Sequence, residues 1–311
     1  MTLEQLRIFV AVAEREHVTQ AARALHLTQS AVSAAVSALE SRYATQLFNR
    51  IGRRIELTQA GRLFLAEARA VLGRAAAAET ALADLTGLKR GALAIAASQT
   101  VANYWLPPLM QRYRAAHPGI ALSLSIGNTE TVAAMVSDGI ADFGFVEGDV
   151  ANLALSVVPV GDDELVLVTS PALTPAKRRP LTAGELGKMR WVFRERGSGT
   201  RAIFETALRD LGVAVAELNI VLELPSNEAV RTAVEHGAGA SALSRLAVQP
   251  ALAAGSLVAL PLDLPKRQFF ALRHNERWSS HAEREFFAMI APGPIPARNR
   301  DSGATARKRK T

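Results

Sequence analysis

Two short helices separated by a tight break constrain the fold of this chain more than any other feature of the sequence. The run Val18–Leu25 is typical of a helix, with Thr19 available as its N-cap, and His26-Leu27 form the break. Thr28 can then cap a second helix that extends to about Glu40. Two helices joined by a turn of about three or four residues form the helix-turn-helix unit, whose second helix enters the DNA major groove.

The second helix is expected to have two faces of different chemistry. An ordinary solvent-facing helix usually carries Glu and Lys, whereas this one carries neither before Glu40. Its outer face instead has short, uncharged side chains that can hydrogen-bond to base edges and phosphates. The inward stripe repeats every three or four residues, at Val32, Ala35, Val36 and Leu39. The candidate DNA-reading residues are Thr28, Gln29, Ser30, Ser33 and Ser37.

A basic hairpin is predicted after this helical pair. Residues 50–57 form two short extended runs around a Gly turn, the form of a β-wing, and Arg50, Arg53 and Arg54 can bind phosphates beside the groove. In isolation the segment would read as a solvated charged turn, and its position beside a helix-turn-helix favours the wing. The small core should be closed by a helix over residues 2–15, with Leu3, Leu6, Phe9, Val10 and Ala13 inward, and by Arg42-Tyr43 and Leu47-Phe48.

Residues 58–86 predict one long Ala-rich helix with no Pro and a single interior glycine, Gly73. A seven-residue apolar repeat of this kind is the pattern of a coiled coil, and pairing with a second copy would bury it. A dimer also supplies two reading helices for two DNA half-sites. Gly87 and Gly91 then predict a hinge. The apolar repeat, which we call the heptad stripe, consists of Phe64, Ala68, Val71, Ala75, Ala78, Leu82 and Leu85.

From Ala92 onward, short apolar strands alternate with helices, which predicts an α/β region with a parallel sheet and right-handed crossovers. The expected strands cover residues 93–97, 120–126, 142–146, 155–160, 165–169, 191–193, 220–224, 240–243, 257–260 and 269–273. The expected helices cover residues 104–116, 131–138, 200–211, 227–236 and 279–290.

The net charge of +7 is unevenly placed along the chain. Residues 1–90 hold 12 Lys and Arg against 8 Asp and Glu, and residues 292–311 hold 6 against 1. The region between them holds 18 against 20, so only the DNA-reading end and the tail are basic. Cysteine is absent, which excludes disulfides and thiolate metal sites. No signal peptide and no membrane span is indicated, and a cytoplasmic location is expected.

The N-terminal sequence resembles the LysR-type transcriptional regulators, with one departure at Ala44, where the family usually has Gly. The resemblance implies a winged helix-turn-helix domain (residues 1–58), a linker helix with a hinge (59–90) and a two-lobed α/β effector domain (91–291) like a periplasmic binding protein. Lobe I would cover residues 91–161 and 267–291, and lobe II residues 162–266, followed by a disordered basic tail (292–311). The residues that carry the resemblance are Leu6, Phe9, Val12, Thr19, Ala21-Ala22, Leu25, Thr28-Gln29-Ser30-Ala31-Val32-Ser33, Leu39-Glu40, Leu47-Phe48, Arg50, Leu57-Thr58 and Ala60-Gly61.

An effector site is expected where strands end and helices begin, because ligands of open α/β sheets lie at the carboxyl ends of the strands. Hydroxyls, amides and glycines at helix N-termini favour an anion there. Glu147 is the exception, since its carboxylate would repel an anion unless it is protonated, bridged by water or paired with a ligand ammonium. The alternative is that Thr100, Thr129 and Thr200 merely cap helices. The candidate effector residues are Ser98, Thr100, Asn128, Thr129, Glu147, Arg196, Ser198 and Thr200.

Other chemistries find little support in the sequence. Residues 237–242 match a dinucleotide fingerprint loosely but follow a helix, and the six histidines are scattered. No catalytic residue, metal site or cofactor is therefore expected. The prediction is a regulator of double-stranded DNA, a homodimer or a dimer of dimers, controlled by a small anion or carboxylate, with RNA polymerase left open as a further partner. The rival interpretations are a solute-binding or transport-type protein and a DNA binder without an effector.

Overall fold

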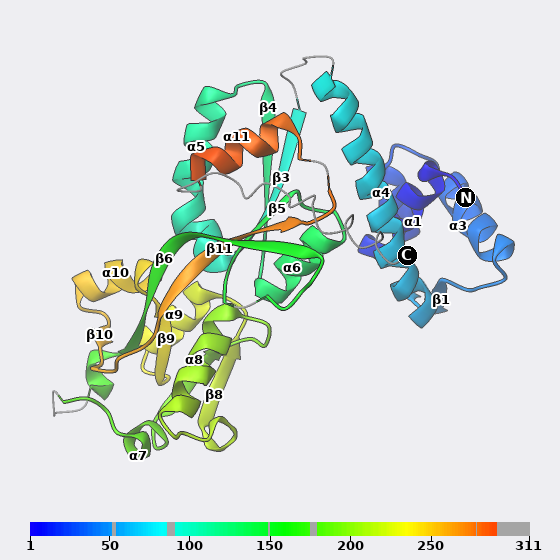
Figure 1. Cartoon of the computed structure of the whole chain (residues 1–311). Helices are drawn as coiled ribbons and strands as arrows, with labels where there is room; N and C mark the ends of the chain where they lie inside the picture. Colours follow the sequence, from blue (N-terminus) through cyan, green and yellow to red (C-terminus); the bar gives the residue numbers. More distant parts are fainter. Residues whose placement is uncertain (52–53, 86–90, 149, 175–178, 278, 291–311) are drawn as a thin grey trace, which may run out of the picture.

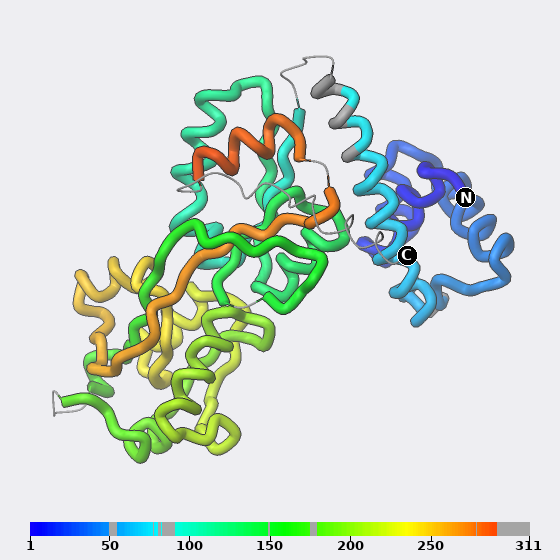
Figure 2. Tube along the Cα trace, in the orientation of Figure 1, coloured from blue at the N-terminus to red at the C-terminus, as the bar shows by residue number. Residues whose placement is uncertain are grey.

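A long helix joins a small helical domain to a two-lobed α/β domain in the computed structural model (Figure 1). The structure describes residues 1–51, 54–85, 91–148, 150–174, 179–277 and 279–290. The trace in Figure 2 follows the chain through the helical domain, along the long helix and into the two lobes. The fold class predicted from the sequence is confirmed, whereas the exact domain boundaries remain predictions.

The N-terminal domain is a winged helix-turn-helix. It contains α1 (Leu3–Arg15), α2 (Val18–Ala24), α3 (Gln29–Arg42) and the antiparallel hairpin of β1 (Phe48–Ile51) and β2 (Arg54–Leu57). One hydrophobic core holds these elements together, and the inward stripe predicted for α3 lies in it, with Ala35 only partly buried. The most deeply buried large side chains of this core are Leu6, Phe9, Val12, Val32 and Leu39.

Two predictions for this domain are wrong, namely the N-cap of α2 and the inward positions of Leu3, Arg42 and Tyr43, all of which are exposed. The N-cap of α2 is His17 and not Thr19, and the His17 side chain makes no capping hydrogen bond. Leu3 and Tyr43 are 41% and 53% exposed, because they lie at the first turn of α1 and at the C-cap of α3, beyond the packed stretch of each helix. Ala44, at the position where glycine was expected, has a φ of 48° and thus adopts the left-handed backbone that glycine tolerates best.

The long helix α4 (Gln59–Leu85) divides the heptad stripe between two environments. Phe64 packs on Phe9, with ring centroids 4.8 Å apart, and Ala68 is buried in the same core. Val71 and Leu82 further along the helix are 41% and 66% exposed. The first two positions therefore belong to the core of the chain itself, and only the later ones remain for a partner. Gly87 and the rest of residues 86–90 lie outside the described residues, as does the tail beyond residue 290.

The α/β domain is built on one strand order, β4-β3-β5-β11-β6-β9-β7-β8. Strands pair in parallel within each lobe, but β6 and β11 run antiparallel to each other and cross both lobes, so the sheet is mixed rather than parallel. Lobe I is built on β3 (Gly91–Ser98), β4 (Ile120–Gly127) and β5 (Phe143–Glu147), and lobe II on β7 (Arg190–Arg194), β8 (Asn219–Leu224) and β9 (Ala240–Ser244). The crossing strands are β6 (Leu155–Thr169) and β11 (Lys266–His274), and the short β10 (Val258–Ala259) pairs with β6.

The prediction of two strands over residues 155–169 is wrong, because β6 is continuous. Its polar middle, residues 161–164, resembles a loop in sequence. Asp163 in that stretch is buried, and its carboxylate accepts a hydrogen bond from Arg267 on β11 at 2.7 Å. This pairing keeps the strand extended.

Helices cover both lobes (Figure 1). One of them, α10 (Arg245–Ala254), was not predicted, because Pro250 inside it interrupts the helical pattern. Ser244 caps its start, and Gly255, with a φ of 73°, ends it. The other helices are η1 (Val101–Trp105), α5 (Leu106–Ala116), α6 (Thr129–Ser137), η2 (Pro171–Leu173), α7 (Ala183–Leu186), α8 (Gly199–Asp210), η3 (Val215–Glu217), α9 (Asn227–Glu235) and α11 (His281–Ile290).

Candidate DNA-binding surface and inter-lobe polar cluster

The outer face of α3 presents the polar side chains predicted to read DNA. Thr28 caps the helix, and its Oγ1 accepts a hydrogen bond from the backbone N–H of Ala31 at 3.2 Å. Gln29, Ser30 and Ser37 are exposed and Ser33 is half-buried. The backbones of Arg50 and Arg54 lie in the wing, but the side chains of both, and Arg53 entirely, lie outside the described residues.

A cavity of about 940 Å³ separates α3 from the wing. Gln29, Ser33 and Ser37 line one wall, and Asn49 at the start of the wing lies among the other lining residues. Glu40 fixes this geometry, since its Oε1 accepts hydrogen bonds from the backbone N–H groups of Leu47 at 2.8 Å and of the next residue at 3.2 Å. This role of Glu40 was not predicted from the sequence. The only feature of the sequence that pointed to it was a single carboxylate at the end of an otherwise uncharged helix face.

Half of the predicted effector residues meet in one buried cluster between the lobes. The Glu147 carboxylate, at the end of β5, accepts a hydrogen bond from the Ser98 hydroxyl. Its Oε1 lies 3.3 Å from the Oγ1 of Thr100 and 3.2 Å from the Oγ1 of Thr200, and both hydroxyls donate to it. Each of these four side chains is at most 2% exposed. Three hydroxyls drawn from both lobes therefore surround one carboxylate.

Arg267 supplies the positive charge of this cluster. Its Nη1 donates to the Oγ1 of Thr200 at 2.9 Å and lies 3.8 Å from the Oε1 of Glu147. Its Nη2 lies 2.5 Å from the Oδ2 of Asp163, and the other Asp163 oxygen accepts from the Ser244 hydroxyl at 2.8 Å. Buried charges require partners of this kind. Neither Arg267 nor Asp163 was predicted from the sequence, although charged residues inside apolar strands were a usable signal.

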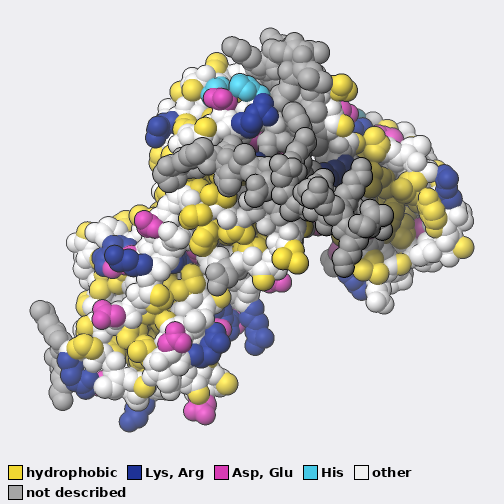
Figure 3. Space-filling view, viewed as in Figure 1, with side chains coloured by type: hydrophobic (Ala, Val, Ile, Leu, Met, Phe, Trp, Pro, Cys, Tyr) yellow, Lys and Arg dark blue, Asp and Glu magenta, His cyan; other side chains and the backbone are white. Residues whose placement is uncertain are grey.

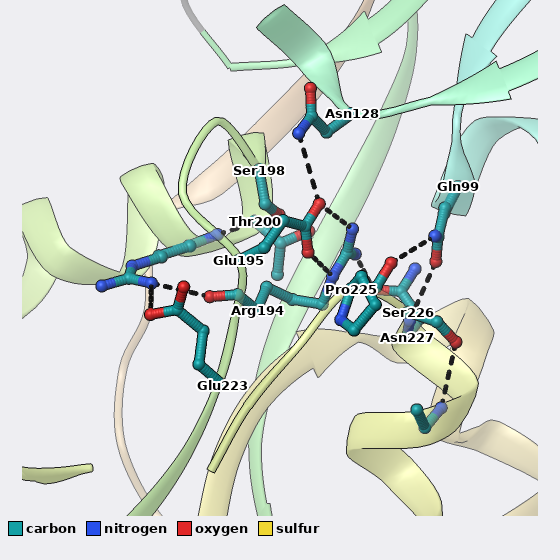
Figure 4. Close-up of polar contacts among 12 residues, drawn as sticks. Gln99, Asn128, Arg194, Glu195, Ser198, Thr200, Glu223, Pro225, Ser226 and Asn227 are labelled. Carbon is teal, nitrogen blue, oxygen red and sulfur yellow. Dashed lines mark hydrogen bonds and ion pairs between the residues drawn. The ribbon is translucent and has the colours of Figure 1, made fainter. Parts of the chain in front are cut away.

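A second set of contacts closes the lobes over the cluster (Figure 4). The side-chain amide of Asn227 donates to the Oγ1 of Thr100 at 3.0 Å, and its backbone N–H donates to the Oε1 of Gln99 at 2.9 Å. Gln99 in turn donates to the carbonyl of Pro225 at 2.7 Å. Arg194 donates to the side-chain oxygen of Asn227. Residues just after β3 in lobe I thus bind the start of α9 in lobe II.

The remaining candidates lie at the edge of the cluster. Asn128 and Ser198 are the N-caps of α6 and α8, accepting hydrogen bonds through their side-chain oxygens. The alternative that Thr100, Thr129 and Thr200 merely cap helices is wrong. The Thr100 and Thr200 hydroxyls donate to the Glu147 carboxylate, and the Thr129 hydroxyl donates to the backbone carbonyl of Glu147 at 2.8 Å. Arg196 is exposed, and its backbone carbonyl accepts a hydrogen bond from Asn128 at 3.4 Å. It is not the cation of the buried cluster.

A cavity of about 750 Å³ opens beside the cluster, between α6 and α8. Thr129 and Ser198 line it, whereas the buried hydroxyls of Thr100 and Thr200 do not. Its walls combine Ala, Val and Ile side chains with polar ones, and three carboxylates, Glu130, Asp138 and Asp210, lie among the lining residues. The volume suits a small organic molecule.

Charges of both signs are intermixed over lobe II on the face shown in Figure 3, so no single-sign patch gathers there. Among the described residues, no three His, Asp or Glu side chains come close enough together to hold a metal ion. No helix in the described part of the chain is long and apolar enough to cross a membrane.

Comparison with known families matches both parts of the chain. Residues 3–62 match the model described as "Bacterial regulatory helix-turn-helix protein, lysR family", and residues 86–293 match "LysR substrate binding domain". An "Uncharacterized HTH-type transcriptional regulator YeiE" of Escherichia coli (strain K12) is 37% identical over 298 residues, covering 95% of this chain and 99% of the relative. A "RuBisCO operon transcriptional regulator" of Allochromatium vinosum is 34% identical, covering 92% and 95%.

Two solved structures are similar in fold. The full-length CbnR in complex with its target DNA has a TM-score of 0.65 at 21% identity, covering 93% of this chain and 99% of that one. The regulatory domain of Synechocystis PCC6803 CcmR in complex with 2-PG has a TM-score of 0.59 at 26% identity, covering 65% of this chain and 96% of that one.

Proposed function

Because this chain belongs to the LysR family of transcriptional regulators, we propose that it reads operator DNA with α3 and the wing, under the control of a small molecule held between its lobes. The DNA-reading part rests on the exposed face of α3. That face is uncharged, offers hydroxyls and an amide, and stands beside a wing that carries three arginines in sequence. Groove reading requires these properties, since hydrogen-bonding groups specify bases and arginines hold phosphates.

DNA reading is tested by Ser33→Glu. A carboxylate at this position would face phosphates and base acceptors, so operator binding in a mobility-shift assay should be lost while the fold is retained. Arg53→Ala should instead weaken binding to operator and random DNA alike and reduce the dependence of affinity on salt. Normal operator binding by Ser33→Glu would contradict the assignment of α3.

The effector proposal rests on the environment of Glu147. Three hydroxyl donors and the guanidinium of Arg267 converge on its carboxylate, which is the set of groups that an anion site needs. Here the protein's own carboxylate accepts those hydrogen bonds. A small anion or carboxylate could take its place if the Glu147 side chain turned away, and the adjoining cavity has room for the rest of a larger ligand.

The relatives support a small effector without naming it for this chain. The CcmR regulatory domain was solved with 2-PG, which makes 2-PG a reasonable probe beside sulfate and phosphate. Oligomerisation through the exposed part of α4 is also proposed, as a dimer or a dimer of dimers. The solute-binding interpretation loses its basis, because the helix-turn-helix model matches residues 3–62.

The effector proposal is tested by calorimetric titration of the best ligand from a thermal-shift screen. Thr100→Ala and Thr200→Ala each remove one hydrogen-bond donor from the cluster, so each should weaken ligand binding by about 1–3 kcal/mol. Both substitutions should leave the helix-turn-helix folded, because both residues belong to the effector domain. Wild-type affinity in both variants would place the pocket elsewhere. A screen with no stabilising ligand would favour the rival interpretation, a DNA binder without an effector.

A further inference from the structure

Helix α6 reaches from the inter-lobe polar cluster to the helix that carries the DNA-binding domain. At its N-terminal end, Thr129 donates to the Glu147 carbonyl at 2.8 Å, and the Glu130 N–H donates to the Gly197 carbonyl of lobe II at 3.4 Å. The helix runs nine residues, about 14 Å, to its C-cap. Its N-terminal end is therefore hydrogen-bonded to both lobes, and its C-terminal end lies one helix length away from these hydrogen bonds.

The C-terminal end of α6 touches α4 backbone to backbone. Gly139 follows the helix with a φ of 78° and lies against Gly73 of α4. A Cβ atom added to Gly73 would lie 2.8 Å from the carbonyl oxygen and 3.2 Å from the Cα of Gly139. Only a residue without a side chain allows so close an approach. Gly73 is also the only glycine of α4 beyond its first turn, and a glycine at such a position is less favourable than Ala by about 1 kcal/mol.

The turn after β11 holds the same stretch of α4. Arg74 lies 3.8 Å from the carboxylate of Glu276 and donates to its backbone carbonyl at 3.5 Å. The buried Arg277 donates to the Ala141 carbonyl at 3.2 Å, and its Nη2 would lie 3.1 Å from a Cβ at Gly73. Two elements of lobe I, the end of α6 and the end of β11, thus meet at one position on α4.

Helix α6 packs tightly against the strand that carries Glu147. Val132 and Val136 are fully buried against β5, and a Cβ added to Gly144 would lie within 2.9 Å of both side chains. Densely packed units of this kind shift as a whole rather than deform. A shift of the strand end at Glu147 would therefore be carried to the Gly139 end as well.

A dimer formed through the heptad stripe would not cover the Gly73–Gly139 contact. Gly73 lies two residues after Val71 and two before Ala75, about 200° around the helix from each. It faces away from the surface expected to meet a second copy. Ala66 lies seven residues earlier on the same face as Gly73 and is exposed.

We propose that α6 and the Gly73–Gly139 contact form a coupling joint, through which the state of the inter-lobe cluster is carried to α4 and the DNA-binding domain of the same chain. The proposal rests on the proposed function only in taking the cluster as the effector site. Its test needs no ligand, because Glu147→Gln changes the charge of the cluster directly.

Hydrogen exchange of the full chain, followed by mass spectrometry, measures the coupling. Glu147→Gln should alter the exchange of residues 134–142 and also of residues 66–76 in α4. In a Gly73→Leu background the response of residues 66–76 to Glu147→Gln should be lost, because the side chain pushes α4 off lobe I. Leucine favours helix over glycine, so the loss cannot come from a weakened α4. Gly73→Ala is the milder alternative if Gly73→Leu fails to fold.

Ala66→Leu is the matched control. It adds the same side chain one heptad away on the same face of α4, where the response of residues 66–76 should persist. The proposal is overturned if Glu147→Gln leaves residues 66–76 unchanged, or if the response survives in both Gly73 variants. Ligand binding is measured separately by calorimetry. An error in the effector site would therefore appear in the titrations, and an error in the coupling joint would appear in the exchange of residues 66–76.

Discussion

The charged residues buried between the lobes carry most of the information at the scale of single residues. Glu147, Arg267 and Asp163 are each at most 9% exposed, and isolated charges at such depth would be strongly unfavourable. They persist because each has an opposite charge within 4 Å and hydroxyl partners besides. Removing Arg267 would deprive both buried carboxylates of this cation, whereas removing the charge of Glu147 leaves Arg267 paired with Asp163.

Glu283 offers a test of pH dependence at the same scale. Burial and the nearby carboxylate of Asp142 raise its pKa to about 7, although Arg277 and hydrogen bonds from Ser280 oppose the shift. The folded state then binds this proton more tightly than the unfolded state. The free energy of unfolding should therefore fall as pH rises from about 4.5 to about 7, by roughly 3 kcal/mol at most.

The prediction is checked by urea unfolding between pH 4 and pH 8. Glu283→Gln should be more stable than wild type at pH 8 and lose that advantage near pH 4, where the wild-type carboxyl is protonated. Glu285→Gln, an exposed change on the same helix, should show no such pattern. Equal pH profiles for Glu283→Gln and wild type would mean that Glu283 ionises normally.

At the scale of elements, α4 serves two surfaces of the molecule. Its first turns complete the core of the DNA-binding domain through Phe64 and Ala68, and its middle touches lobe I at Gly73. Between these contacts and beyond them an apolar remainder of the heptad stripe stays exposed, including Val71 and Leu82. Exposed apolar residues at heptad spacing are typical of a helix that pairs with another copy.

Replacing Val71 and Leu82 together by Asp should dissociate the oligomer, because charges at these positions cannot be buried unpaired between two helices. Light scattering of the purified protein measures the result. The control is Leu153→Asp with Leu211→Asp, two exposed leucines of the effector domain, which should leave the mass unchanged. An unchanged mass for the α4 variant would mean that the effector domains alone hold the assembly.

At the scale of the whole molecule, the two lobes are joined by crossing strands and closed by hydrogen bonds over one carboxylate. Because both lobes contribute donors to Glu147, whatever replaces or neutralises that carboxylate changes the contacts between the lobes. The same group should therefore decide which class of ligand the protein accepts.

Glu147→Gln distinguishes the ligand classes. If the effector is a simple oxyanion, the variant should bind it as well as or better than wild type, since a repelling charge is gone. A ligand with an amino group should instead lose about 1–3 kcal/mol of binding free energy, because the carboxylate that pairs with its ammonium is gone. Calorimetry with sulfate, phosphate and 2-PG, and then with amino-bearing compounds, measures both cases. No change with any bound ligand would exclude Glu147 from the site.

The sequence by itself determined the features that depend on near neighbours. Thr28 caps α3, the stripe of Val32, Val36 and Leu39 turns inward, and the wing follows, because capping and helical periodicity act within a few residues. The strand ends that carry Ser98, Thr100, Glu147 and Thr200 could be located for the same reason.

Only the tertiary structure decided what those strand ends bind. Arg267 lies 104 residues from Asp163 and 67 from Thr200 along the chain, and no local pattern links them. The continuity of β6 likewise depends on its pairing with β11, which holds a polar stretch extended. The packing of Phe64 on Phe9 and the burial of Ala68 also depend on α1. Such contacts join distant segments, so the packed fold selects them and local spacing does not.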